Sequence, residues 1–190
     1  HWMQQDFSEG ITPPVLYNLG VRGDTVEKVA QRLEAEFKCR GEYRNRLPDG
    51  ILLSVGMNDS PRLGQPEGKT YTDFHRFERT MEMVLERSLE LAESVYFVGM
   101  VPTDPYKMPF LNLLYYNHSD QYRYKEATQE LCQSLGIPYL DLFERWLSLG
   151  DHWWQSRLSA DGLHPTHLGY ASIFEAVLEW KALKSLFSRE

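Results

Sequence analysis

Ile51-Leu52-Leu53-Ser54-Val55-Gly56-Met57-Asn58-Asp59 is the stretch that decides the fold, because an apolar run stops there at a glycine followed by short polar residues. Such a run is too short for a helix and is typical of a strand that is buried on both faces. Three more runs of this kind occupy residues 15–19, 95–100 and 138–143. We therefore predict four buried strands.

Segments of helical periodicity separate these runs, with apolar residues recurring every three or four positions. We predict helices over residues 25–37, after Asp73, over residues 119–135 and from Pro165 onward. The predicted core face of the last helix comprises Leu168, Ala171, Phe174, Val177 and Leu178. Because strands that alternate with helices are joined by crossovers, the sequence predicts an α/β fold with a mainly parallel sheet covered on both faces.

Composition limits the class of protein. The 190 residues are expected to form one domain, since single cores of this size are common. The net charge of −7 disfavours a nucleic-acid partner, which requires a basic face. No apolar run approaches the roughly 18 residues of a membrane span, no signal peptide is visible, and cysteines are few, which favours a cytoplasmic location. Neither Cys39 nor Cys132 has zinc-binding spacing, and no cofactor or metal is expected.

The segment Asp161-Gly162-Leu163-His164-Pro165 opens the last predicted helix. An aspartate three residues before a histidine in a turn can accept the imidazole Nδ1–H, which leaves Nε2 free to act as a general base. The alternative is that Asp161 caps the helix and His164 packs beside it.

Asn58 follows a buried strand at the point where the strand ends. The carboxyl ends of parallel strands form the ligand crevice of such folds, and an asparagine amide there can donate to a substrate oxygen. The alternative is an ordinary turn, because Asn and Asp are common turn residues.

The third segment, Asn18-Leu19-Gly20-Val21-Arg22-Gly23-Asp24-Thr25, joins the first predicted strand to the first predicted helix. Backbone N–H groups at a glycine turn before a helix attract developing negative charge. The segment lacks the glycine spacing of a dinucleotide site and the Gly-Lys ending of a phosphate loop, which disfavours phosphate binding.

In order and spacing, these three segments resemble blocks of the GDSL/SGNH family of serine ester hydrolases, from Asn18 to the last helix. The resemblance implies a flavodoxin-like three-layer α/β/α sandwich. It also implies hydrolysis of a small ester, thioester or acetylated substrate through an acyl-enzyme. In this family pattern Asp161 and His164 are the catalytic triad partners, and Gly23 and Asn58 form the oxyanion hole.

The serine block of the family is the one part of the pattern that is missing. In the family the nucleophile lies in a Gly-Asp-Ser-Leu-like motif after the first strand, and no Gly-Asp-Ser occurs in this sequence. Ser8, the only serine before Asn18, follows no apolar run and lies too close to leave room for a helix. Since loss of a central strand would leave unpaired sheet edges, we expect a strand and a Gly-Asp-Ser turn upstream of His1.

Two other functions remain open at this point. A catalytically inactive relative would use the same cleft to bind a carbohydrate, lipid or protein partner, and the missing serine favours this hypothesis. A flavodoxin-like nucleotide or flavin binder would share the fold but requires a phosphate loop, which the sequence lacks. The presence of Asp161, His164 and Asn58 as a set favours the hydrolase.

Overall fold

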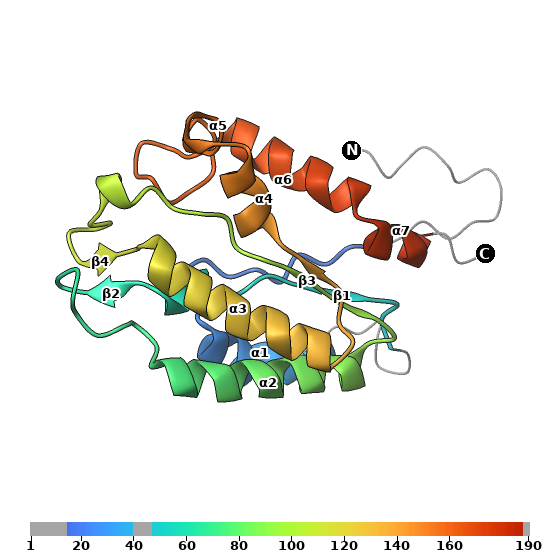
Figure 1. Ribbon diagram of the computed structural model, residues 1–190. Coiled ribbons are helices and arrows are strands. Elements are labelled where there is room, and N and C mark those ends of the chain that lie inside the picture. Colours follow the sequence, from blue (N-terminus) through green and yellow to red (C-terminus); the bar gives the residue numbers. More distant parts are fainter. Residues whose placement is uncertain (1–14, 40–46, 188–190) are drawn as a thin grey trace.

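The computed structural model describes residues 15–39 and 47–187 (Figure 1). In chain order its elements are α1 (Val26–Cys39), β1 (Ile51–Leu53), η3 (Met57–Asp59), β2 (Arg62–Leu63), α2 (Phe74–Leu91), β3 (Val95–Val98), η4 (Pro105–Lys107), β4 (Leu114–Tyr115), α3 (His118–Ser134), β5 (Tyr139–Leu140), α4 (Leu142–Ser148), α5 (Asp151–Gln155), α6 (His167–Glu179) and α7 (Lys181–Phe187).

The main sheet is parallel, and its strand order is β1-β3-β5. Ile51 pairs with Val95 at the start of the β1–β3 ladder, and Phe97 pairs with Tyr139 at the start of the β3–β5 ladder. Among residues 15–39 and 47–187, no second strand pairs with β1 along its outer edge. The predicted α/β class with a parallel sheet is confirmed.

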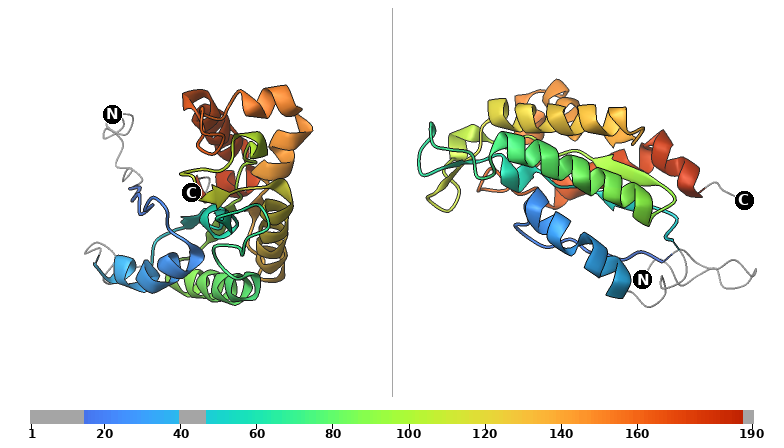
Figure 2. Two further views of the ribbon diagram at one scale, coloured as in Figure 1. Left: turned by 90° about the vertical axis from the view of Figure 1, so that its left-hand side faces the viewer. Right: turned by 90° about the horizontal axis from the view of Figure 1, so that it is seen from below.

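The sheet is covered on both faces, and β3 is fully buried at its centre. Side chains alternate along a strand, so Val95 and Phe97 enter one core with α1, α2 and α3. Val98 enters a second core with residues of α4, α5 and α6. Figures 1 and 2 show the two helical layers with the sheet between them. The molecule is therefore a three-layer α/β/α sandwich, as expected.

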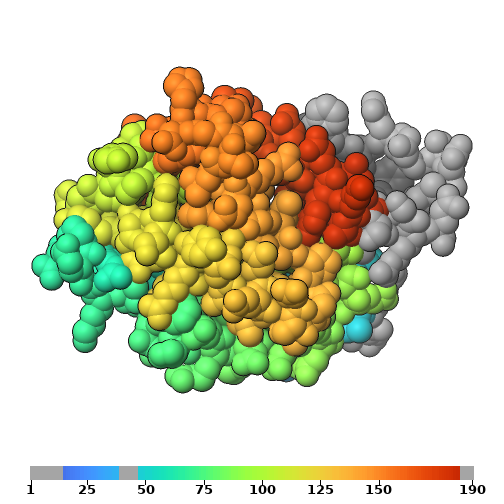
Figure 3. Space-filling model, viewed as in Figure 1, coloured from blue at the N-terminus to red at the C-terminus, as the bar shows by residue number. Residues whose placement is uncertain are grey.

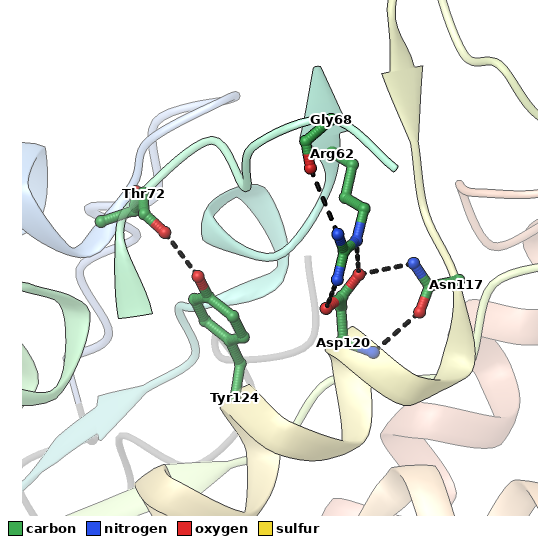
Figure 4. Close-up of polar contacts among 6 residues, drawn as sticks. All are labelled: Arg62, Gly68, Thr72, Asn117, Asp120 and Tyr124. Atoms are coloured by element: carbon green, nitrogen blue, oxygen red, sulfur yellow. Dashed lines mark hydrogen bonds and ion pairs between the residues drawn. The ribbon is translucent and has the colours of Figure 1, made fainter. Parts of the chain in front are cut away.

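A two-stranded antiparallel ribbon of β2 and β4 lies at one end of the sandwich (Figure 1). Arg62 in β2 forms a double contact with Asp120 in α3, from Nε to Oδ2 at 2.5 Å and from Nη2 to Oδ1 at 2.9 Å (Figure 4). Asn117 Nδ2 donates to the same carboxylate at 2.6 Å. These contacts fix the ribbon against the start of α3, and Figure 3 shows the two segments adjoining at the surface.

The predicted strand at residues 15–19 is wrong. Val15 and Leu16 are 62% and 80% exposed, and residues 15–20 adopt no strand structure. A strand needs a neighbour to satisfy its backbone N–H and C=O groups, and no described strand lies alongside this segment.

The predicted run at residues 138–143 is only partly a strand. β5 comprises two residues, because Asp141 ends it and caps the next helix by accepting the Glu144 N–H at 3.0 Å. Leu142 and Phe143, predicted in the strand, therefore lie in α4.

Three predicted helices correspond closely to α1, α2 and α3, whereas α6 differs. It begins at His167 rather than Pro165, because Thr166 is its N-cap. Three residues of its predicted core face are more than half exposed, namely Leu168, Phe174 and Leu178. Among the helices that the structure describes, none is both long and apolar enough to cross a membrane.

Candidate functional site

Asp161 and His164 lie in the turn before α6, and their side chains are in direct contact. Asp161 Oδ2 lies 2.8 Å from His164 Nδ1. Asp161 Oδ1 accepts hydrogen bonds from Ser159 Oγ at 2.6 Å and from the backbone N–H groups of Leu163 and His164 at 2.9 and 3.0 Å. His164 Nε2 has no hydrogen bond to any residue in the described part of the chain. The aspartate thus stabilises the turn and also orients the ring.

The surroundings of Asp161 keep its carboxylate ionised. Burial acts to raise its pKa, but hydrogen bonds from Ser159 and from the His164 and Leu163 backbone outweigh burial and hold the pKa of Asp161 well below its usual range. A carboxylate that stays charged stabilises the imidazolium formed when the ring takes up a proton. The pair is therefore suited to proton transfer at Nε2.

A second loop holds this turn in place. The backbone N–H of Asp104, just before η4, donates to Gly162 O at 2.7 Å. Gly162 has a φ of +70°, and a Cβ atom there would lie 2.8 Å from Lys107 Cβ. Only glycine fits this close approach, so the position of His164 depends on the loop of residues 104–107.

Phe110 completes the surroundings of His164. Its ring centroid lies 5.5 Å from that of His164 in an edge-to-face arrangement. Phe110 was not predicted from the sequence, because it lies in a loop without periodicity and a phenyl ring carries no ionisable or hydrogen-bonding group.

Gly23 lies in the turn that leads into α1. Its φ of +78° is a left-handed conformation that favours glycine. Arg32 holds the turn against the helix, because its Nε donates to Asp24 Oδ2 and its Nη1 donates to Leu19 O, each at 2.7 Å. Within residues 15–39 and 47–187 the Gly23 N–H donates no hydrogen bond, so it is available to an added acceptor.

Asn58 lies in η3, which begins four residues after the end of β1, and contacts the Gly23 turn. Its Nδ2 donates to Asp24 O at 2.9 Å. A side-chain amide nitrogen carries two hydrogens, so one N–H of Asn58 remains for another acceptor. The two residues that the sequence predicted as oxyanion donors are therefore joined through Asp24.

A cavity of about 380 Å³ brings Gly23, Asn58 and His164 together, with Asp161 behind the histidine and outside the lining. The cavity lies beyond the ends of β1 and β3, where ligands bind in parallel α/β sheets. Arg22 and Ser54 also line it. Much of the remaining wall is apolar and includes Val55, Val98, Val101, Leu142, Leu163 and Ile173.

A three-layer sandwich with such a cavity and an Asp–His pair places the protein in the class of α/β proteins that bind ligands at the carboxyl ends of parallel strands. Within that class the sequence model of the GDSL-like lipase/acylhydrolase family matches residues 1–172. The chain belongs to this family.

Solved structures agree with this fold. A lipase/acylhydrolase from Enterococcus faecalis has a TM-score of 0.62 at 18% identity, covering 82% of this chain and 69% of that one. An acetylxylan esterase from Geobacillus stearothermophilus has a TM-score of 0.60 at 14% identity, with coverage of 82% and 67%. A GDSL-like lipase from Parabacteroides merdae has a TM-score of 0.60 at 17% identity, with coverage of 88% and 72%. A comparison with curated protein sequences gives no match.

Proposed function

We propose that this protein hydrolyses a carboxylic ester of a small molecule through an acyl-enzyme. In this mechanism a serine hydroxyl attacks the ester carbonyl carbon while its proton moves to His164 Nε2. The same proton then passes to the departing alcohol. In the second half of the reaction water attacks the acyl-enzyme and gives a proton to His164. His164 then returns this proton to the departing serine oxygen, which releases the acid and restores the enzyme.

The observation that carries the proposal is the convergence of three distant segments on one cavity. His164 is oriented by Asp161 at 2.8 Å and presents Nε2 without a partner among the described residues. Gly23 and Asn58 line the same cavity and each retains an N–H donor. Two N–H donors aimed at one oxygen stabilise the negative charge that develops in acyl transfer.

The nucleophile is proposed to come from a further strand that pairs with the outer edge of β1. Within residues 15–39 and 47–187 no serine hydroxyl is hydrogen bonded to the imidazole ring of His164. A parallel strand along β1 would end beside the cavity, because the carboxyl ends of parallel strands lie at the same edge. A serine in the turn after that strand would lie among His164, Gly23 and Asn58.

The substrate is proposed to be a small ester, and an acetylated sugar is the first compound to test. One structural relative is an acetylxylan esterase. The apolar wall of the cavity suits the acyl group, and Arg22, which also lines the cavity, is proposed to contact a polar leaving group.

Turnover of p-nitrophenyl acetate tests the role of His164. His164→Ala should abolish turnover while the circular dichroism spectrum stays unchanged, because the ring is half-buried and its loss opens no core cavity. His167→Ala is the matched control, since His167 is an exposed histidine only three residues away. Wild-type turnover in His164→Ala would overturn the proposal.

Labelling with a fluorophosphonate, followed by peptide mapping, tests the nucleophile. We expect the label on a serine outside the described residues and unchanged labelling in Ser54→Ala. Label on Ser54 would move the nucleophile to the end of β1. A protein that takes up no label and hydrolyses no ester would contradict the hydrolase proposal.

A further inference from the structure

Asp59 is a buried carboxylate that the mechanism above does not use. It follows Asn58 directly, is the last residue of η3, and is 0% exposed. Its Oδ2 accepts the backbone N–H of Val26, the first residue of α1, at 3.0 Å. Its Oδ1 accepts the Thr72 hydroxyl at 2.6 Å. One side chain therefore joins three segments that are distant in the sequence.

The helix that Asp59 holds is the one that follows the Gly23 turn. Val26 lies three residues after Gly23, and in the opposite direction Asn58 Nδ2 donates to Asp24 O at 2.9 Å. The Asn58–Asp59 pair and the turn into α1 are thus joined by two crossing hydrogen bonds, one from each side. The Thr72 N–H adds a further bond to Asp59 O at 3.1 Å, which fixes the backbone of η3.

We propose that Asp59 is a positioning residue for the oxyanion donors: its carboxylate fixes the start of α1, and thereby the Gly23 N–H, relative to the Asn58 amide. This role rests on the proposed hydrolase function. Asp59 lies outside the cavity lining, so it acts through Val26 and Asn58 and does not touch the substrate.

The cost of burying this carboxylate argues for a specific role. Burial raises the pKa of Asp59 to about 6, although hydrogen bonds from Thr72 and Val26 act to lower it and the charge of Glu27 raises it further. Tyr116 and Tyr124 also interact electrostatically with Asp59. No arginine or lysine in the described part of the chain forms an ion pair with Asp59. Among these residues, the ionised carboxylate of Asp59 is stabilised by the Val26 N–H and the Thr72 hydroxyl.

Steady-state kinetics distinguish a positioning role from a purely structural one. Asp59→Ala removes both contacts, and we expect kcat to fall on the order of ten- to a hundredfold with KM nearly unchanged, because oxyanion donors act mainly in the transition state. Asp59→Asn keeps one acceptor oxygen and should retain more activity than Asp59→Ala. Unchanged kcat in folded Asp59→Ala would overturn the proposal.

Asp73→Ala is the matched control. Asp73 also accepts a backbone N–H at a helix start, from Arg76 at 3.1 Å, but it is exposed and serves α2. Loss of this cap should leave kcat unchanged. If Asp59→Ala does not fold, Thr72→Val takes its place, because it removes one donor to the carboxylate and should lower kcat less. Wild-type kcat in Thr72→Val would then count against the proposal.

A measurement without substrate separates this inference from the hydrolase proposal. In ¹⁵N-labelled protein the Val26 amide shift should titrate with a midpoint near the pKa of Asp59, about 6, and the titration should vanish in Asp59→Asn. If the Val26 amide titrates but the protein has no esterase activity, the contact between Asp59 and Val26 is supported and the hydrolase proposal is wrong. An amide shift that is independent of Asp59 would reject the positioning role even in an active enzyme.

Discussion

Asp161 uses both carboxylate oxygens within one turn, and the two oxygens have different roles. Oδ1 accepts three hydrogen bonds that shape the turn, from Ser159, Leu163 and the His164 backbone. Oδ2 is left for the imidazole of His164. Helix capping by Asp161, the alternative to ring orientation, is wrong, because Thr166 is the N-cap of α6. Asp161 instead shapes the preceding turn and orients the ring. A substitution that preserves the hydrogen bonds of the turn and removes the charge can therefore separate the two roles.

Asp161→Asn is that substitution. The amide oxygen can replace Oδ1 in the turn, but the negative charge beside Nδ1 is lost and the amide N–H₂ favours the wrong imidazole tautomer. We expect ester turnover to fall by about 10³-fold or more, with the fold intact. Asp151→Asn is the control, because Asp151 accepts a local hydrogen bond from Trp154 Nε1 at 3.1 Å and does not line the cavity. A loss of less than tenfold in Asp161→Asn would contradict the assigned role.

Asp59 gives the stability of the protein a measurable pH dependence. Burial raises its pKa from 3.8 to about 6, so the folded state holds this proton more tightly than the unfolded state. The bound proton contributes its full stabilisation below about pH 4, and this contribution is lost as the pH rises through about 6. A shift of about two units corresponds to roughly 2–3 kcal/mol.

Denaturant unfolding of wild type and Asp59→Asn between pH 4 and 7 measures how much the Asp59 proton contributes to stability. The difference in unfolding free energy should move in favour of the variant by roughly 2–3 kcal/mol as the pH rises, because the amide has no charge to bury. A difference that is constant across the range would show that the carboxylate is not destabilised by burial.

At the scale of elements, local signals predicted α2 well and α6 poorly. α2 begins directly after Asp73, as predicted, with Asp73 as its N-cap, and its residues Phe77, Met81 and Val84 are buried. In α6 apolar residues surround much of the helix, so periodicity alone could not identify the face that packs. That face is set by Gly169, where a Cβ atom would lie 2.3 Å from Arg157 O, and this close approach is a tertiary property.

Gly162 tests how strongly the turn before α6 depends on the neighbouring loop. Gly162→Ala forces a residue with a Cβ into φ +70° and places that atom 2.8 Å from Lys107 Cβ. We expect a loss of about 2–3 kcal/mol in unfolding free energy and lower ester turnover, because the turn must shift and carry His164 with it.

Gly136→Ala is the control for backbone strain. Gly136 has a φ of +69°, and no atom lies within 4 Å of an added Cβ, so this variant should lose only about 1 kcal/mol and keep its turnover. Equal losses in the two variants would mean that the contact with the loop of residues 104–107 does not constrain the turn.

At the scale of the whole molecule, the convergence of the candidate site was predictable, whereas its internal contacts were not. The rule that ligands bind at the carboxyl ends of parallel strands predicted that Asn58 lies at the cleft. The family resemblance implied that Gly23 and His164 join it there. The bonds from Asn58 to Asp24 and from Val26 to Asp59 join residues more than thirty positions apart, and no local pattern encodes such pairs. The β2–β4 ribbon escaped prediction because two-residue strands have no measurable periodicity.

The ribbon depends on one nearly buried ion pair. Asp120 is 4% exposed and lies at the start of α3, while its partner Arg62 comes from β2, 58 positions away. Burial acts to raise the pKa of Asp120, but hydrogen bonds from Arg62 and Asn117 hold it below its usual value. Arg62 Nη1 also donates to Gly68 O at 3.2 Å and thereby fixes the loop before Thr72. In the same region the Tyr124 hydroxyl donates to Thr72 O (Figure 4).

Arg62→Met should therefore destabilise the molecule more than the loss of an exposed ion pair would. It leaves a buried carboxylate without its cation, and we expect a loss of about 2 kcal/mol in denaturant unfolding. Adding Asp120→Asn should restore part of this loss, because the unpaired charge is then removed. Arg145→Met is the control, since the Arg145–Glu179 pair is exposed and should contribute less than about 0.5 kcal/mol. If the losses from Arg62→Met and Asp120→Asn simply add, the carboxylate does not depend on Arg62, and the ribbon is held by other contacts.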